Sequence, residues 1–272
     1  MVQCIISSFP AELPSIDATN FQLKVCLEPC AIALLLQSSN SILQAAEYFA
    51  WDEKDNGQPT KIMDELKKKS RLLNINQAKT IVYFCTEAAM LLPSELAANV
   101  RLLLQVQFGF QHGEGCLQKN LNNGIVIGWK LSSVWAEFFT EQFPGHTCQS
   151  SLGSLINSID FTVPDTIFLA FGNGLVEMVV VFNQQLQLAK CFYYTTIEDV
   201  HYQLLNICKQ LHATPSNVQL RIQGFIEKDG TLYRSLQTFF NDAHMLASDN
   251  SNWSETLKAL PANYFTGLIQ TK

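Results

Sequence analysis

The sequence is poor in charged residues. Only 15% of its 272 residues are Asp, Glu, Lys or Arg, whereas 47% are hydrophobic. Disordered chains have the opposite balance, so this chain is expected to fold around a substantial core. It also lacks any run of four basic residues, and its formal net charge is −6. Because a protein that binds nucleic acid through phosphates needs Lys and Arg, we predict that this one does not bind nucleic acid.

Long apolar runs are absent as well. The longest, Cys30–Leu36 and Met178–Phe182, are far shorter than the ~20 residues with which a helix spans a bilayer. The opening segment Met1–Pro14 has no basic residue ahead of its short apolar stretch, which is untypical of a secretory signal. We therefore predict no membrane insertion and a cytoplasmic location.

Cys-x-x-Cys pairs are missing, although the chain has 8 cysteines. Cys26 and Cys30 could face each other across a hairpin, so a disulfide or a metal pair is one interpretation. Reduced thiols in apolar segments are the favoured one, because cytosolic proteins rarely keep disulfides. No zinc-ligand spacing occurs, and no pattern pairs a histidine with a nucleophile. The sequence thus predicts neither a metal site nor a catalytic residue.

The first half opens with three β-type runs. They are Phe21–Leu27, Cys30–Gln37 and Ile42–Phe49. The short break Glu28-Pro29 between the first two runs is typical of a hairpin. Thr60–Leu72 then has helical spacing with Thr60 as N-cap, and Thr80–Phe84 is typical of a buried strand. The order is therefore three strands, a helix and a strand.

Residues 85–124 interrupt this regularity and are predicted to be an irregular insertion. Pro93–Val106 has helical spacing, but Phe108–Asn123 is dense in Gly, Gln and Asn and is expected to be a loop or an insertion. After the insertion, Ile125–Trp129 is typical of a strand. Two predicted helices, Ser133–Phe143 and Ser150–Ile159, complete the first half.

The second half repeats the opening pattern. Its predicted strands are Thr166–Phe171, Leu175–Phe182, Leu186–Tyr194, Asn217–Ile222 and Ala243–Leu246, and its predicted helices run from Thr195 or Thr196 to His212 and over Gly230–Phe240. A meander that leads into helix–strand alternation produces a mixed sheet covered by helices. We therefore predict the α/β class, with two RNase H-like lobes over residues 1–160 and 161–272. Two such lobes in tandem make the actin-like ATPase arrangement.

A more specific likeness rests on several segments of the chain. They are Ile167–Phe182, Phe192–Asp199, Val218–Gly224 and Leu260–Phe265, together with the opening hairpin and Ile81–Phe84. On these segments the chain resembles an uncharacterised Bacteroidota family, a domain of unknown function with a degenerate actin-like ATPase fold. That family is distantly similar to type IV pilus assembly platform proteins. The resemblance covers nearly the whole chain, but its motifs indicate fold and family rather than chemistry.

The resemblance also implies where a nucleotide would bind. In actin-like ATPases the first hairpin of each half approaches the phosphates with an Asp-x-Gly turn, whose glycine lets backbone N–H groups come close and whose acid organises Mg²⁺. Here the first turn has Glu28 as its only acid and no glycine. The second turn is Gly172-Asn173-Gly174, which has the glycines without the acid. Gly224 stands where an adenosine-contacting glycine is implied. These five residues are the candidate cofactor-binding positions. We expect no cofactor, and ATP is the cofactor that the resemblance offers as the alternative.

Four of the five candidate positions also have an ordinary structural interpretation, which we favour. Hairpin geometry explains Gly172 and Gly174, a strand-to-helix turn explains Gly224, and a solvated turn explains Glu28. An RNase H-type nuclease would need several converging carboxylates, which the strands do not supply.

We therefore expect a non-catalytic interaction or scaffold protein with an unknown protein partner. The first alternative is a nucleotide-binding switch, or an ATPase- or kinase-like enzyme, that uses the interlobe cleft. The second, weaker alternative is a small-molecule sensor that uses the cleft without phosphate contacts. Two aromatic segments could contact a partner: the loop Phe108–Gly115, and the terminal residues Trp253, Tyr264 and Phe265. Ordinary packing within their own domain is the commoner role of such segments.

Overall fold

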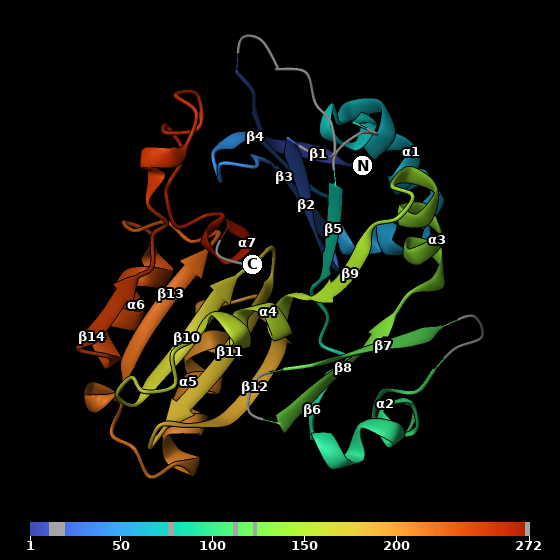
Figure 1. The fold of residues 1–272 in the computed structure, drawn as a ribbon. Coiled ribbons are helices and arrows are strands. Elements are labelled where there is room, and N and C mark those ends of the chain that lie inside the picture. The colour runs from blue at the N-terminus through green and yellow to red at the C-terminus, as the bar shows by residue number, and fades with distance from the viewer. Residues whose placement is uncertain (11–19, 76–78, 111–113, 122–123, 270–272) are drawn as a thin grey trace. The chain divides into compact units, whose positions relative to one another are not determined.

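Figure 1 shows the computed structural model of the chain, which describes residues 1–10, 20–75, 79–110, 114–121 and 124–269. They form two compact units. The first unit contains Met1–Gly153 and Asp249–Leu260, and the second contains Ser154–Ser248 and the residues from Pro261 onward. The chain thus passes between the units after Gly153, after Ser248 and after Leu260. No helix in the described part of the chain is long and apolar enough to cross a membrane.

The first unit is built on a sheet of six strands in the order β1-β4-β3-β2-β5-β9. The strands are β1 (Gln3–Ser8), β2 (Phe21–Glu28), β3 (Ala31–Ser38), β4 (Leu43–Ala50), β5 (Lys79–Phe84) and β9 (Thr147–Ser150). β2, β3 and β4 form an antiparallel meander, and β5 and β9 continue the sheet in parallel from β2. Helix α1 (Pro59–Lys69) joins β4 to β5, α3 (Ser133–Gln142) precedes β9, and α4 (Ser151–Ser158) follows it.

A buried carboxylate fastens the end of α1 to this sheet. Glu47 of β4 is only 1% exposed. Its oxygens accept hydrogen bonds from the backbone N–H of Arg71 at 3.0 Å and of Leu72 at 3.1 Å, and from the Ser70 hydroxyl. These donors lie just after α1, so Glu47 satisfies groups that a helix end and the following turn would otherwise leave unpaired.

The segment Asp249–Leu260 returns to the first unit late in the sequence. Its Trp253 is buried and forms an isolated parallel bridge with Leu43 of β4. The backbone N–H of Ser254 donates to the Leu43 carbonyl at 2.9 Å, and the Ser254 hydroxyl donates to the Gln44 carbonyl at 3.1 Å. No pattern in the sequence indicated this return, and the predicted lobe boundary at residue 160 stays a prediction.

The predicted irregular insertion contains a small sheet of its own. Strands β6 (Ala89–Pro93), β8 (Ile125–Leu131) and β7 (Gly115–Asn120) pair in the order β6-β8-β7, and α2 (Val100–Phe108) packs on them around Val100, Leu104 and Val126. The prediction of a loop over Phe108–Asn123 is therefore wrong for β7. Half of its sequence, GCLQKN, is polar and none of its residues is fully buried, so hydrophobic alternation is too weak to indicate a strand.

The second unit has a sheet of five strands in the order β12-β11-β10-β13-β14. They are β10 (Thr166–Phe171), β11 (Leu175–Phe182), β12 (Gln185–Tyr193), β13 (Gln219–Gly224) and β14 (Asp242–Met245). Its helices are α5 (Ile197–Gln210), α6 (Thr231–Phe239) and α7 (Thr266–Ile269). α5 begins with a capping box, in which the Thr196 hydroxyl accepts from the Asp199 N–H and the Asp199 carboxylate accepts from the Thr196 N–H.

Both units contain the same sheet topology. In each, the first strand of the meander (β2 or β10) lies in the middle of the sheet. It is antiparallel to the second strand of the meander (β3 or β11) and parallel to the strand that follows the first helix (β5 or β13). The second unit has this pattern alone, whereas the first adds β1 at one edge and inserts the small sheet between β5 and α3. The prediction of an α/β fold built from a repeated unit of three strands and helix–strand alternation is confirmed.

Candidate functional site

Four of the five candidate positions lie at one end of the sheet in the second unit. Gly224, the last residue of β13, is in register with Phe171, the last residue of β10. The turn Gly172-Asn173-Gly174 starts at the next residue along the chain. Because β10 and β13 run in parallel, both carboxyl ends meet here, which is where α/β sheets commonly bind ligands. Glu28 belongs to the first unit and is described separately below.

The Gly172–Gly174 turn has the geometry of a tight hairpin. The Gly172 N–H donates to the Leu175 carbonyl at 2.8 Å, and the Gly174 carbonyl accepts from the Tyr194 N–H at 3.0 Å. Gly174 has φ +72°, a backbone conformation that residues with a side chain rarely adopt. Its conformation therefore accounts for the glycine at position 174 without any ligand.

Gly224 is required by a close approach of two backbones. Its φ is +92°, and a Cβ added there would lie 2.1 Å from the Phe171 carbonyl oxygen. The next residue, Phe225, donates its N–H to the same oxygen at 2.8 Å. Only a residue without a side chain fits this close approach between the ends of the neighbouring strands β13 and β10.

Asn263, which sequence reasoning did not single out, closes the Gly224 turn from the C-terminal segment. Its side-chain amide donates to the carbonyls of Gly224 at 2.8 Å and of Ile226 at 2.9 Å, and its own carbonyl accepts from the Gly224 N–H at 2.9 Å. Asn263 is 6% exposed, and the rings of Tyr264 and Phe265 lie 5.1 and 5.6 Å from that of Phe225. Both backbone polar groups of Gly224 are thus satisfied within the unit.

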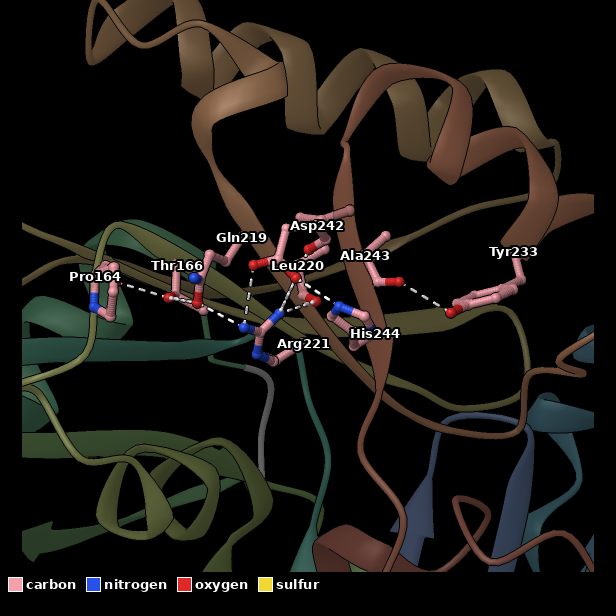
Figure 2. Close-up of polar contacts among 9 residues, drawn as sticks. All are labelled: Pro164, Thr166, Gln219, Leu220, Arg221, Tyr233, Asp242, Ala243 and His244. Carbon is pink, nitrogen blue, oxygen red and sulfur yellow. Dashed lines mark hydrogen bonds and ion pairs between the residues drawn. The ribbon is translucent and has the colours of Figure 1, made fainter.

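A polar network occupies the sheet face at β13 and β14 (Figure 2). The Arg221 guanidinium donates to the Asp242 carboxylate at 3.0 Å and to the Gln219 side-chain oxygen at 2.6 Å, and His244 Nε2 lies 2.8 Å from Asp242. The hydrogen bond from Arg221 holds the pKa of Asp242 below its usual range. The Tyr233 hydroxyl donates to the Ala243 carbonyl at 3.0 Å, so a helix side chain satisfies a polar group of β14, an edge strand of this sheet.

Glu28 of the first unit is not a solvated turn residue, and that interpretation is wrong. It is the last residue of β2, pairs with Ala31 of β3 and is only 6% exposed. The Tyr48 hydroxyl donates to its carboxylate at 3.3 Å. Burial, reinforced by the negative charge of Glu28, raises the pKa of Tyr48. The strand simply extends further than the apolar run suggested, so the turn begins after Glu28.

Lys24 lies on the same face of β2 as Glu28, because side chains four residues apart point the same way along a strand. It is 3% exposed, and burial lowers its pKa to about 8. The buried face of β2 therefore carries two ionisable side chains of opposite sign. Cys26, between them in sequence, forms no disulfide with Cys30, whose sulfur accepts from the Asn56 amide at 3.4 Å.

The aromatic segments proposed as partner contacts pack within their own units. Phe108 and Phe110 lie against the core of the small sheet, while residues 111–113 of that loop lie outside the described residues. Trp253 and Phe265 are buried. The exposed apolar side chains of this region are instead on α2, where Leu102 is 60% and Val106 77% exposed.

Comparison with known proteins identifies the family. Residues 15–242 match the family described as "Protein of unknown function (DUF3822)". The chain belongs to this family. No curated protein matches this chain.

Two solved structures are similar over almost the entire chain. One is a protein of Bacteroides thetaiotaomicron described as having an actin-like ATPase fold and unknown function, with a TM-score of 0.75, 19% identity, and 95% of this chain and 100% of that chain covered. The other is the PilM–PilN type IV pilus biogenesis complex, with a TM-score of 0.57, 11% identity, and 95% and 98% covered. At these identities the likeness shows the fold, which is that of the actin-like ATPases. The predicted family and fold are confirmed.

Proposed function

We propose that this chain is a non-catalytic protein-interaction module built on the actin-like fold. One observation carries the proposal. Asn263 of the same chain already forms hydrogen bonds with both the N–H and the carbonyl of Gly224. This is the end of the sheet at which Gly172 and Gly174 also lie. A backbone N–H that donates to its own chain cannot also donate to a phosphate or an adenosine without breaking that bond.

The surroundings of Glu28 support the same proposal. Phosphoryl transfer needs a solvent-accessible carboxylate that can bind Mg²⁺ and its water ligands. Glu28 is buried and accepts a hydrogen bond from Tyr48. The following residue, Pro29, has no N–H to offer a phosphate.

A protein partner is the second part of the proposal. One of the similar structures is, by its title, a complex of two pilus biogenesis proteins, PilM and PilN, which supports a role in assembly for the same fold here. The exposed Leu102 and Val106 of α2 are suitable partner contacts, because they share one helix face and no charged residue lies between them. The short apolar runs support a cytoplasmic site of action.

Thermal unfolding with and without Mg²⁺-ATP, ADP and GTP at millimolar concentration tests the proposal. We expect no change of Tm, because a ligand that does not bind the folded state does not stabilise it. Hydrolysis of ATP is measured in parallel on the unchanged protein and on Glu28→Gln. ATP hydrolysis that disappears in Glu28→Gln would overturn the proposal.

A nucleotide-binding switch is the alternative, and one observation favours it. Four of the candidate positions gather at the carboxyl ends of two parallel strands, which suits a ligand site. It predicts that ATP raises Tm by several degrees and that this rise is lost in Asn173→Ala, a substitution of an exposed turn residue.

A further inference from the structure

A cysteine and a histidine lie in contact at the start of β9 in the first unit. Cys148 Sγ is 3.3 Å from His146 Nε2, which is within the range of a hydrogen bond to sulfur. The two residues are separated by one position, so along an extended strand their side chains fall on the same side. No pattern in the sequence pairs these two residues, because β9, which places their side chains on one side, has too weak a signal to be predicted as a strand.

A backbone carbonyl fixes which nitrogen of His146 carries the proton. His146 Nδ1 lies 3.0 Å from the carbonyl oxygen of Phe143. A carbonyl can only accept, so Nδ1 must donate and the neutral ring bears its hydrogen there. The lone pair of Nε2 then faces Cys148, and the thiol donates its S–H to it. The ring is oriented by a third group, as in enzymes that activate a cysteine with a histidine.

The pair is also reachable by a small reagent. β9 is the last strand of its sheet, and both Cys148 and His146 are half-buried rather than fully buried. Phe139 of α3 lies beside the imidazole, with 6.4 Å between ring centroids. Burial raises the pKa of the Cys148 thiol, so the resting group is the thiol, and reaction requires that its proton pass to His146.

We propose that Cys148 and His146 form a reversible thiol-modification site for a low-molecular-weight disulfide such as oxidised glutathione. The Cys148 thiol gives its proton to His146 Nε2, and the thiolate attacks one sulfur of the disulfide. The new bond joins Cys148 Sγ to that sulfur while the old S–S bond breaks. The leaving thiolate takes the proton from His146 and departs as a thiol, so one disulfide and one thiol are consumed and one of each is formed.

The test measures the rate of mixed-disulfide formation at each cysteine of the folded protein. The protein is incubated with oxidised glutathione at neutral pH, and peptide mass mapping follows Cys148 and Cys116. Cys116 of β7 is the matched control, since it is also half-buried and no described histidine contacts it. We expect Cys148 to react at least tenfold faster than Cys116, and the difference to vanish in urea, where neither residue has a structured neighbour.

Two substitutions separate proton transfer from simple exposure. His146→Asn keeps a donor near Nδ1 and removes Nε2, and His146→Gln keeps a polar atom of similar reach without a base. In both variants the rate at Cys148 should fall to that of Cys116, with the rate at Cys116 unchanged. Equal rates at Cys148 and Cys116 in the unchanged protein would overturn the proposal even if both variants failed to fold. A fast Cys148 that stays fast in either folded variant would also overturn it.

Discussion

Asn263 offers a direct measure of how firmly the C-terminal segment closes the Gly224 turn. Asn263→Ala removes the two hydrogen bonds that its side chain donates to the carbonyls of Gly224 and Ile226, but leaves the bond from the Gly224 N–H to the Asn263 carbonyl in place. A buried hydrogen bond contributes about 1 kcal/mol, and a buried carbonyl left unsatisfied costs about 1–3 kcal/mol more. We therefore expect the free energy of unfolding to fall by about 2–4 kcal/mol.

Urea unfolding, followed by circular dichroism, measures this change. Asn217→Ala is the matched control, because Asn217 lies in the same unit and is exposed. Surface substitutions of this kind usually change the free energy of unfolding by less than about 0.5 kcal/mol. Asn263→Asp adds a second comparison: it keeps the volume but loses both donors, and should destabilise at least as much as alanine. If both Asn263 variants matched the control, the side chain would not hold the turn, and the proposed function would rest only on the backbone hydrogen bond from the Gly224 N–H to the Asn263 carbonyl.

Three further changes test other parts of the structure. Gly224→Ala should lower the free energy of unfolding by well over the ~1–2 kcal/mol that left-handed backbone strain alone costs, because the added Cβ would clash with a backbone oxygen. The control Gly145→Ala, at φ +81° with open space around it, should show only that strain. Equal losses of Tm in the two variants would argue against the clash. Glu47→Gln should lower the free energy of unfolding by about 2 kcal/mol or more. The control Glu95→Gln, at an exposed residue, should change it very little. An unchanged free energy of unfolding in Glu47→Gln would mean that the buried carboxylate is dispensable. Burial lowers the pKa of Lys24 to about 8, so between about pH 8 and 10.4 the unfolded chain holds a proton that the folded one does not, and stability should rise with pH by up to about 3 kcal/mol. Lys24→Met should abolish this rise in urea unfolding, and persistence of the rise in the variant would assign it to another group.

The elements that the sequence predicted well share a strong local signal. β2, β3 and β11 are mostly apolar segments bounded by turns. The N-cap of α5 is Thr196, whose hydroxyl and the Asp199 carboxylate form a capping box. Such signals depend on a few neighbouring residues and are therefore readable without the fold. β9, with only four residues and one of them buried, has no comparable signal.

The candidate site was less predictable, because its contacts join distant parts of the chain. Gly224 and Asn263 are 39 residues apart, and nothing near either residue indicates the other. Glu28 was assigned to a turn because a charged residue next to proline usually marks one, but its neighbours across the sheet bury it. Only the pairing of β2 with β3, which fixes Glu28 opposite Ala31, reveals this.

The return of Asp249–Leu260 to the first unit has a consequence for how the protein is made. A chain leaves the ribosome from its N-terminus, and N-terminal domains commonly fold before the rest is synthesised. Here Leu43 of β4 finds its partner Trp253 only when nearly the whole chain has emerged. The first unit therefore lacks part of its structure while the second unit is translated. A gene fragment that stops at Gly153 would encode the first unit without the segment that contacts Leu43 and Gln44.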